Sequence, residues 1–216
     1  MPIQHIKQLI KEQFSGEGSG HDWHHIERVY KMACAIQEKE GGDREIVELA
    51  ALFHDISDHK LNGGKLNAGG NEALKILQSL NYDKEKTELI AKIVDGVSYK
   101  GAHVQDQMDS VEGKIVQDAD RLDAIGAIGI ARAFAYGGSR NRPLYEPEQS
   151  PEMHNSFEEY AKAQSHTVNH FYEKLLLLKN RLNTPTGKEL GEKRHQIMED
   201  FLNEFHHEWN FNTQKQ

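Results

Sequence analysis

The chain has a single cysteine and no long apolar segment, and each absence excludes a class of protein. Cys34 has no second cysteine to pair with, so an internal disulfide is impossible. No apolar run approaches the roughly 20 residues that a helix needs to cross a bilayer. The first residues, MPIQHIKQLIKEQF, lack the apolar core of a signal peptide. We therefore expect a cytoplasmic protein that is not part of a membrane.

Basic residues are in the minority, which argues against a nucleic-acid polymer as partner. The sequence holds 26 lysines and arginines against 34 aspartates and glutamates, a formal net charge of −8. Binding along a nucleic-acid backbone requires a basic surface. Any phosphate substrate must therefore be met by local cations.

The apolar residues recur at helical spacing. His25 is followed by apolar residues four, seven, eight and eleven positions later, which is one face of an α-helix that ends at the glycine pair 41–42. Asp43 is a good N-cap for the next helix, which brings His54 and Asp55 near its C-terminal end. No two-residue alternation of the kind seen in strands is convincing. The spacing therefore predicts an all-α fold.

The length of 216 residues fits one domain, and no linker separates a second one. Further helices are expected over about 71–80, 84–94, 156–180 and 186–208, with a short one around Asp120. The polar stretch 137–155 contains three of the five prolines. It is longer than the usual limit of about 12 to 15 residues for a loop, which suggests a lid. We expect a single domain over 1–216, with a core at about 20–136, this loop, and C-terminal helices over about 156–208.

Three separate segments contain residues suited to one metal site. GHDWHHIERV contains His25, AALFHDISDHK contains the pair His54-Asp55, and IVQDADRLDAIG contains Asp120. Two imidazoles and two carboxylates suit a divalent ion such as Mn²⁺, Ni²⁺, Co²⁺ or Mg²⁺. An octahedral ion with four protein ligands keeps positions for water and substrate, which is typical of a catalytic site. The pattern predicts one divalent ion bound by these four residues.

The order His, His-Asp, Asp resembles the HD-domain metal-dependent phosphohydrolase superfamily, and the flanking segments are similar to its YpgQ/YedJ-like bacterial branch. A bare His-Asp dipeptide is a weak signal, because chance produces it often. Four spaced ligands inside three matching segments are a strong one. The resemblance runs from about Gly20 to the late segment HFYEKLLLLKNRLNTPTGKEL. It implies a helical HD domain that hydrolyses a nucleotide or another phosphorylated small molecule.

His21 is a rival first ligand, because it lies four residues before His25 and could share its helix face. The H-x-x-R-V pattern that begins at His25 matches the family segment, whereas the glycines before His21 indicate a fraying helix entrance. Asp22 is then simply the N-cap of this helix. Arg28 and Asp123 are interpreted as structural ion-pair partners rather than as catalytic residues.

Charge balance indicates a mechanism. Asp55 and Asp120 offset the two positive charges of the ion, which can still activate a bound water for attack on phosphorus. Asp58 is the candidate for positioning or deprotonating this water, so Asp55 and Asp58 are the expected catalytic carboxylates. The candidate substrate-binding residues are Lys60, Arg140, Arg142, His170 and Lys174.

Several reaction classes remain as alternatives. The resemblance implies a nucleoside triphosphate pyrophosphohydrolase, and the alternative among hydrolases is a phosphomonoesterase or a cyclic-nucleotide phosphodiesterase. An HD-fold di-iron oxygenase needs extra histidine ligands between Asp55 and Asp120, where only His59 and His103 occur. This favours a single metal. A non-catalytic nucleotide-binding module is disfavoured because all four ligands are present.

Overall fold

In a computed structural model, the described part of the chain consists of helices and connecting segments without a strand, which confirms the all-α prediction. The structure describes residues 2–14, 22–56, 68–98, 108–153 and 165–211. The helices are α1 (Pro2–Gln13), α2 (Trp23–Glu40), α3 (Arg44–Phe53), α4 (Ala68–Ser79), α5 (Lys84–Val97), α6 (Val111–Asp123), α7 (Gly126–Ser139), α9 (Thr167–Glu173), the 3-10 helix η1 (Leu175–Arg181) and α10 (Pro185–Asn210).

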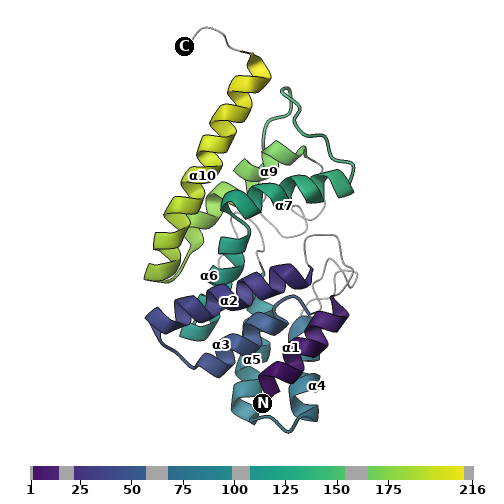
Figure 1. Cartoon of the computed structure of the whole chain (residues 1–216), viewed down its shortest axis with the longest axis vertical. Coiled ribbons are helices and arrows are strands. Elements are labelled where there is room, and N and C mark those ends of the chain that lie inside the picture. Colours follow the sequence, from purple (N-terminus) through teal and green to yellow (C-terminus); the bar gives the residue numbers. More distant parts are fainter. Residues whose placement is uncertain (1, 15–21, 57–67, 99–107, 154–164, 212–216) are drawn as a thin grey trace.

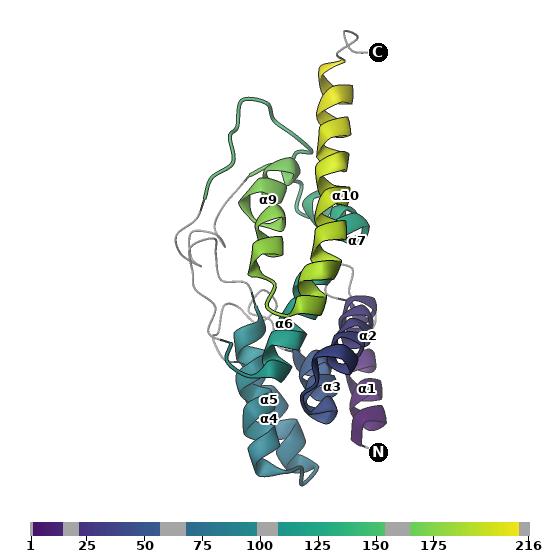
Figure 2. The same ribbon diagram turned by 90° about the vertical axis from the view of Figure 1, so that its left-hand side faces the viewer.

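Helices α1 to α5 occupy one half of the molecule and α7, α9 and α10 the other, with α6 between them (Figure 1). Helix α2 packs against α3 and α6, and α4 packs against α5. Helix α10 packs against α6 and α7, and its far end lies at the opposite end of the molecule from α1 in both views (Figures 1 and 2). Helix α6, which contains Asp120, therefore joins the two halves.

Aspartate caps determine where the first two helices of the site begin. The Asp22 side chain accepts a hydrogen bond from the backbone N–H of His25 at 2.8 Å, so Asp22 is the N-cap of α2 as expected. Asp43 accepts from two backbone N–H groups in the first turn of α3, which confirms the second predicted cap. Gly41, with a φ of 82°, ends α2 in a conformation that favours glycine. These caps fix the positions at which His25 and His54 enter the core.

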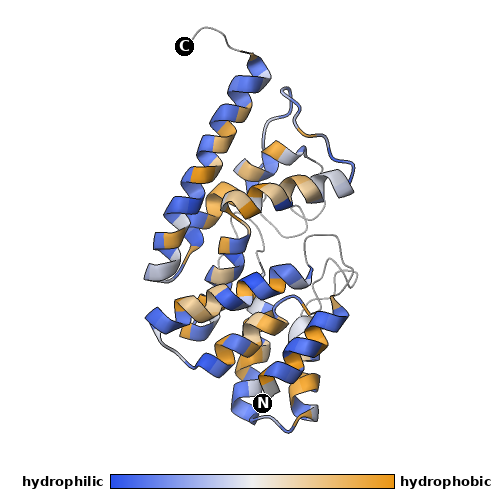
Figure 3. Cartoon of the chain, viewed as in Figure 1, coloured by the Kyte–Doolittle hydropathy of each residue, from blue (hydrophilic) through white to orange (hydrophobic). Residues whose placement is uncertain are grey.

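The apolar stripes of the helices meet in one core, and hydrophobic residues lie mainly on the inner helix faces (Figure 3). Val29, Leu49 and Ile115 are completely buried, and each such side chain contributes roughly 1.5 to 3 kcal/mol by leaving water. His25 and His54 lie among them with 1% and 4% exposure. None of the helices formed by described residues is both long enough and apolar enough to span a bilayer.

The late part of the chain departs from the predicted helix over 156–180. Residues 154–164 lie outside the described residues, and the described part is divided into α9 and η1 at Lys174 (φ −141°, ψ −60°). Leu175 and Leu178 are buried three residues apart, which matches the three-residue turn of a 3-10 helix. The prediction of one continuous helix was therefore wrong here. Helix α7 also extends to Ser139, so the connecting segment begins at Arg140.

The described part of the predicted lid segment is hydrogen bonded to α9. The backbone N–H of Thr167 donates to the carbonyl of Pro143 at 3.0 Å. The buried carboxylate of Glu173 accepts from the backbone N–H of Glu152 at 3.2 Å. These contacts hold both ends of the segment 143–152 on α9, and its movement as a lid stays a prediction.

Candidate metal centre

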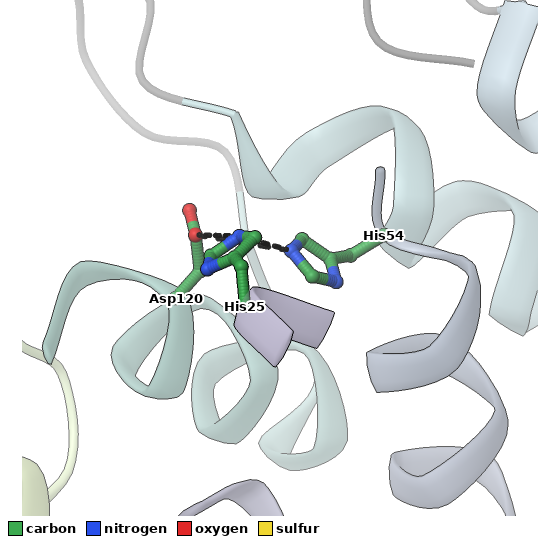
Figure 4. Close-up of side chains that lie close together, drawn as sticks. All are labelled: His25, His54 and Asp120. Atoms are coloured by element: carbon green, nitrogen blue, oxygen red, sulfur yellow. Dashed lines mark hydrogen bonds and ion pairs between the residues drawn. The ribbon is translucent and has the colours of Figure 1, made fainter. Parts of the chain in front are cut away.

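Three predicted ligands, His25, His54 and Asp120, converge where α2, the end of α3 and α6 meet (Figure 4). His25 lies in the first turn of α2, His54 is the C-cap of α3, and Asp120 lies in the last turn of α6. One potential ligand atom from each lies within 4.8 Å of the other two. The N-caps set the residues at which α2 and α3 begin. The packing of α2 on α3 and α6 then brings together residues from distant parts of the sequence.

Asp55 contributes a fourth atom to the same space. Its Oδ2 lies 3.2 Å from His25 Nε2 and 3.6 Å from His54 Nε2, and these two nitrogens are 3.1 Å apart. Asp120 Oδ1 lies 3.6 Å and 3.9 Å from the same nitrogens. Adjacent ligands on an ion with bonds of about 2.1 Å lie about 3.0 Å apart at right angles and about 3.6 Å apart at 120°. The atoms therefore have the spacing of one coordination shell.

The outer ring nitrogens of both histidines are already engaged. His54 Nδ1 lies 2.8 Å from the carbonyl oxygen of Ala51, and His25 Nδ1 lies 2.7 Å from Oδ2 of Asp123. Because a carbonyl or an ionised carboxylate can only accept, each Nδ1 is the donor. With Nδ1 protonated, the Nε2 of a neutral imidazole carries the lone pair that can bind a metal ion.

Four acceptor atoms that face one another require positive charge between them. Burial alone lowers the pKa of His25, but hydrogen bonds with Asp123 and Asp55 outweigh burial and raise the pKa above its usual value. The site therefore attracts a cation, and a divalent ion balances the charges of Asp55 and Asp120. Two imidazole nitrogens and two carboxylate oxygens fit one divalent ion.

Asp123 holds the outer face of His25 and is itself held by two arginines. Arg28 Nε donates to Asp123 Oδ1 at 2.7 Å, and Arg132 Nη1 donates to Oδ2 at 2.8 Å. Burial alone raises the pKa of Asp123, but the hydrogen bonds from His25 and Arg28 hold it well below its usual range. Asp123 is therefore an ionised, 1% exposed partner for the imidazole. The sequence predicts that Arg28 and Asp123 each take part in a structural ion pair, but not that they pair with each other or that Asp123 contacts His25.

Arg132 is a residue of this site that the sequence motifs do not identify. It is the only charged residue of α7, among the small and apolar residues of GAIGIARAFAYGGS. A charge kept in such a helix indicates a fixed partner, because an unpaired charge near a core is costly. This isolated charge is the signal that could have found Arg132.

Comparison with known proteins decides the family. The sequence pattern of the family described as HD domain matches residues 22–125, which include all four predicted ligands. The protein YpgQ of Bacillus subtilis is 41% identical over 201 residues, covering 92% of this chain and 89% of YpgQ. The chain belongs to the HD-domain family.

Solved structures show that the similarity of this HD protein extends over the late helices too. A crystal structure from Lactobacillus plantarum has a TM-score of 0.86 and 33% identity, covering 98% of both chains. An HD-superfamily hydrolase from Bacillus thuringiensis has a TM-score of 0.75 and 41% identity, covering 97% of both chains. YpgQ of Bacillus subtilis in complex with ADP has a TM-score of 0.73 and 37% identity, covering 94% of this chain and 95% of YpgQ.

Several predicted residues of the HD protein belong to segments outside the described residues. Asp58, the candidate for orienting water, and Lys60, a candidate phosphate contact, lie outside the described residues. The rival ligand His21 and the further histidines His59 and His103 do so as well. Their predicted roles stay predictions.

The other candidate substrate contacts lie on α9 and on the segment after α7. The guanidinium carbons of Arg140 and Arg142 lie 5.4 Å and 5.7 Å from the ring centre of Tyr136, within the range of cation–π contacts. His170 lies on α9 and Lys174 follows its last residue, and both are half-buried. Their contact with a substrate of this HD protein stays a prediction.

Proposed function

We propose that this HD protein is a metal-dependent phosphohydrolase that acts on nucleotides, as a nucleoside triphosphate pyrophosphohydrolase. The proposal is based on one observation, the convergence of acceptor atoms from His25, His54, Asp55 and Asp120. A bound Mn²⁺, Ni²⁺, Co²⁺ or Mg²⁺ would polarise a phosphoryl oxygen and lower the pKa of a bound water.

The exposure of the ligands indicates the side from which substrate approaches. The side chains of His25 and His54 are 1% exposed and that of Asp55 is 7% exposed, whereas that of Asp120 is 27% exposed. The centre is therefore closed behind the histidines and open beside Asp120. Water and a phosphoryl group reach it from this side, while the buried side chains keep the imidazoles oriented.

The chain supplies groups for the remaining steps. The carboxylates of Asp55 and Asp120 balance a divalent charge, so the substrate phosphates need further cations. We assign the orientation or deprotonation of the attacking water to Asp58, three residues after Asp55. The phosphate contacts in this proposal are Lys60, Arg140, Arg142, His170 and Lys174.

A nucleotide substrate is supported by a relative and by overall charge. YpgQ, 37% identical to this chain in its structure, was crystallised in complex with ADP. The formal charge of −8 suits a small phosphorylated ligand better than a nucleic-acid polymer. We also propose that residues 1–216 form one domain, because similarity to the solved structure from Lactobacillus plantarum covers 98% of both chains.

The product pair tests the proposal. Purified protein is incubated with each nucleoside triphosphate and Mn²⁺ in ¹⁸O-labelled water. The products are separated, and their masses are determined by mass spectrometry. We expect the monophosphate and pyrophosphate, with the label on whichever of the two contains the attacked phosphorus. A diphosphate with labelled orthophosphate would mean attack at the terminal phosphorus and would contradict the assignment.

Two further outcomes would change the class of reaction. Intact nucleoside triphosphates together with hydrolysis of simple phosphomonoesters would make the protein a phosphomonoesterase. A requirement for iron and oxygen would exclude hydrolysis altogether. A panel of Mn²⁺, Ni²⁺, Co²⁺, Mg²⁺ and Fe²⁺, each with and without chelator, separates these outcomes.

A further inference from the structure

Arg28 is linked to the candidate metal ligand His25 through Asp123. It follows His25 by one helical turn on α2, so the two side chains lie on neighbouring positions of one helix face. Its guanidinium donates from Nε to Asp123 Oδ1 at 2.7 Å and from Nη2 to Asp123 Oδ2 at 3.0 Å. The same Oδ2 lies 2.7 Å from His25 Nδ1. One carboxylate therefore fixes both the guanidinium and the metal-binding imidazole.

The bonds to Asp123 leave part of the Arg28 guanidinium available. A guanidinium has five N–H donors, and the two bonds to Asp123 use only two of them. Within the described part of the chain, the hydrogen bonds that Arg28 donates go to Asp123. The Arg28 side chain is 36% exposed. The remaining N–H groups can therefore meet an anion that reaches the centre from solvent.

Asp123 keeps a second guanidinium as partner when Arg28 is removed. Arg132 Nη1 donates to Asp123 Oδ2 at 2.8 Å and to the Asp123 backbone carbonyl at 3.3 Å, and its side chain is less exposed, at 21%. Two guanidiniums share the carboxylate of Asp123, and the carboxylate of Asp22 adds a smaller electrostatic attraction for Arg28. A purely structural pair needs only one arginine, so the second and more exposed one is left to explain.

We propose that Arg28 is a phosphate-binding residue: Asp123, which binds the outer nitrogen of His25, fixes the guanidinium so that its remaining N–H groups bind oxygens of the substrate phosphates. The planar guanidinium suits this role because it can donate two parallel hydrogen bonds to a phosphate. The inference rests on the proposed function, since it requires a phosphorylated substrate at the metal. It adds to that function a cation that is already fixed before the substrate arrives.

The test separates phosphate binding from support of the metal ligands. In Arg28→Gln, we measure Mn²⁺ affinity by titration with electron paramagnetic resonance, and ADP affinity by calorimetry at a fixed concentration of free Mn²⁺. ADP affinity should fall by about 10- to 100-fold, the usual effect of losing hydrogen bonds to a charged group. Mn²⁺ affinity should change little, because Arg132 still holds Asp123 and Asp123 still holds His25.

Two variants control for charge and for folding. Lys31→Gln removes one positive charge from the same helix at a side chain that is 66% exposed, and it should leave ADP affinity unchanged. Arg28→Lys keeps the charge but loses the planar fork, so its ADP affinity should lie between those of Arg28→Gln and the wild type. Because lysine still neutralises Asp123, this variant keeps the test valid if Arg28→Gln does not fold.

The outcomes are distinct. An unchanged ADP affinity in both Arg28 variants overturns the inference while the proposed function stands. A parallel loss of Mn²⁺ and ADP affinity overturns it as well, because Arg28 would then act only through Asp123. If the wild-type protein binds neither ADP nor any nucleoside triphosphate with Mn²⁺ present, the inference and the proposed function fail together.

Discussion

One carboxylate oxygen of Asp118 accepts both the backbone N–H and the hydroxyl of Thr184, each at 2.7 Å. The other oxygen accepts from the backbone N–H of Asn183 at 2.8 Å and from its side-chain amide at 2.9 Å. Asp118 is fully buried on α6, two residues before Asp120, and Thr184 is the N-cap of α10. Helix α6, which contains the candidate ligand Asp120, is thus hydrogen bonded directly to the start of α10.

Loss of the hydrogen bonds that Asp118 accepts should destabilise the whole domain. Asp118→Ala leaves several buried donors without an acceptor, and we expect it to lower the free energy of unfolding by about 2 to 4 kcal/mol. Urea unfolding followed by circular dichroism measures this. The matched control is Asp109→Ala, which removes an 87% exposed carboxylate. Similar losses in the two variants would contradict the role of Asp118.

Replacement of the most exposed ligand should remove the metal but keep the fold. Asp120→Asn has the same shape as the wild-type residue but lacks one of the two balancing charges, so we expect it to lose most of its bound metal and its activity. Elemental analysis after gel filtration measures metal content, and Asp109→Asn is the control. Wild-type metal content in Asp120→Asn would remove Asp120 from the ligand set.

Asp123 should affect the metal without contacting it. Asp123→Asn removes the charge that orients His25, and replacements of such supporting partners lower metal affinity by about 10- to 100-fold. Titration with Mn²⁺ measures this change. Because the four ligands are intact, excess Mn²⁺ should restore most of the activity. A variant whose activity stays low at saturating Mn²⁺ would show that Asp123 has another role.

The contact between Glu40 and Thr186 should make stability depend on pH. Glu40 Oε1 accepts from the backbone N–H of Thr186 at 2.7 Å, in the first turn of α10. Hydrogen bonds from the Thr186 side chain and backbone lower the pKa of Glu40. A carboxyl with a lowered pKa in the folded state contributes stability above its unfolded pKa, and this contribution is lost as the pH falls through the folded value.

Glu40→Gln should therefore weaken the dependence of the free energy of unfolding on pH in the acid range. Because Glu40 is partly exposed, we expect a difference of about 1 kcal/mol or less between pH 5 and pH 3. Urea unfolding of the variant and the wild type at several pH values measures the difference. Parallel pH curves for the two proteins would exclude a contribution from this carboxylate.

The sequence predicts α2 and α3 well because their signals are local. An apolar stripe runs between the N-cap Asp22 and the glycine pair 41–42, and Asp43 then begins the next helix. The candidate ligands His25 and His54 lie inside motif segments, so their proximity follows from the family resemblance. Spacing within one segment is enough to predict each of the two helices.

Features that depend on tertiary contacts could not be predicted in this way. The helix break at Lys174 involves neither proline nor glycine, and the leucines after it fit a three-residue turn as well as a 3.6-residue one. The contact of Asp123 with His25 joins residues 98 positions apart, and Arg132 reaches the same carboxylate from another helix. Only the packing of α2, α6 and α7 brings these residues together.

The distance in sequence between the four candidate ligands links metal binding to folding. The unfolded chain separates His25 from Asp120 by most of the HD core, so an ion that needs all four ligand atoms binds the native state alone. Such an ion raises the free energy of unfolding by about 2.7 kcal/mol when its free concentration is 100 times its Kd. The melting temperature of the protein should then serve as a gauge of how much of it is loaded with metal.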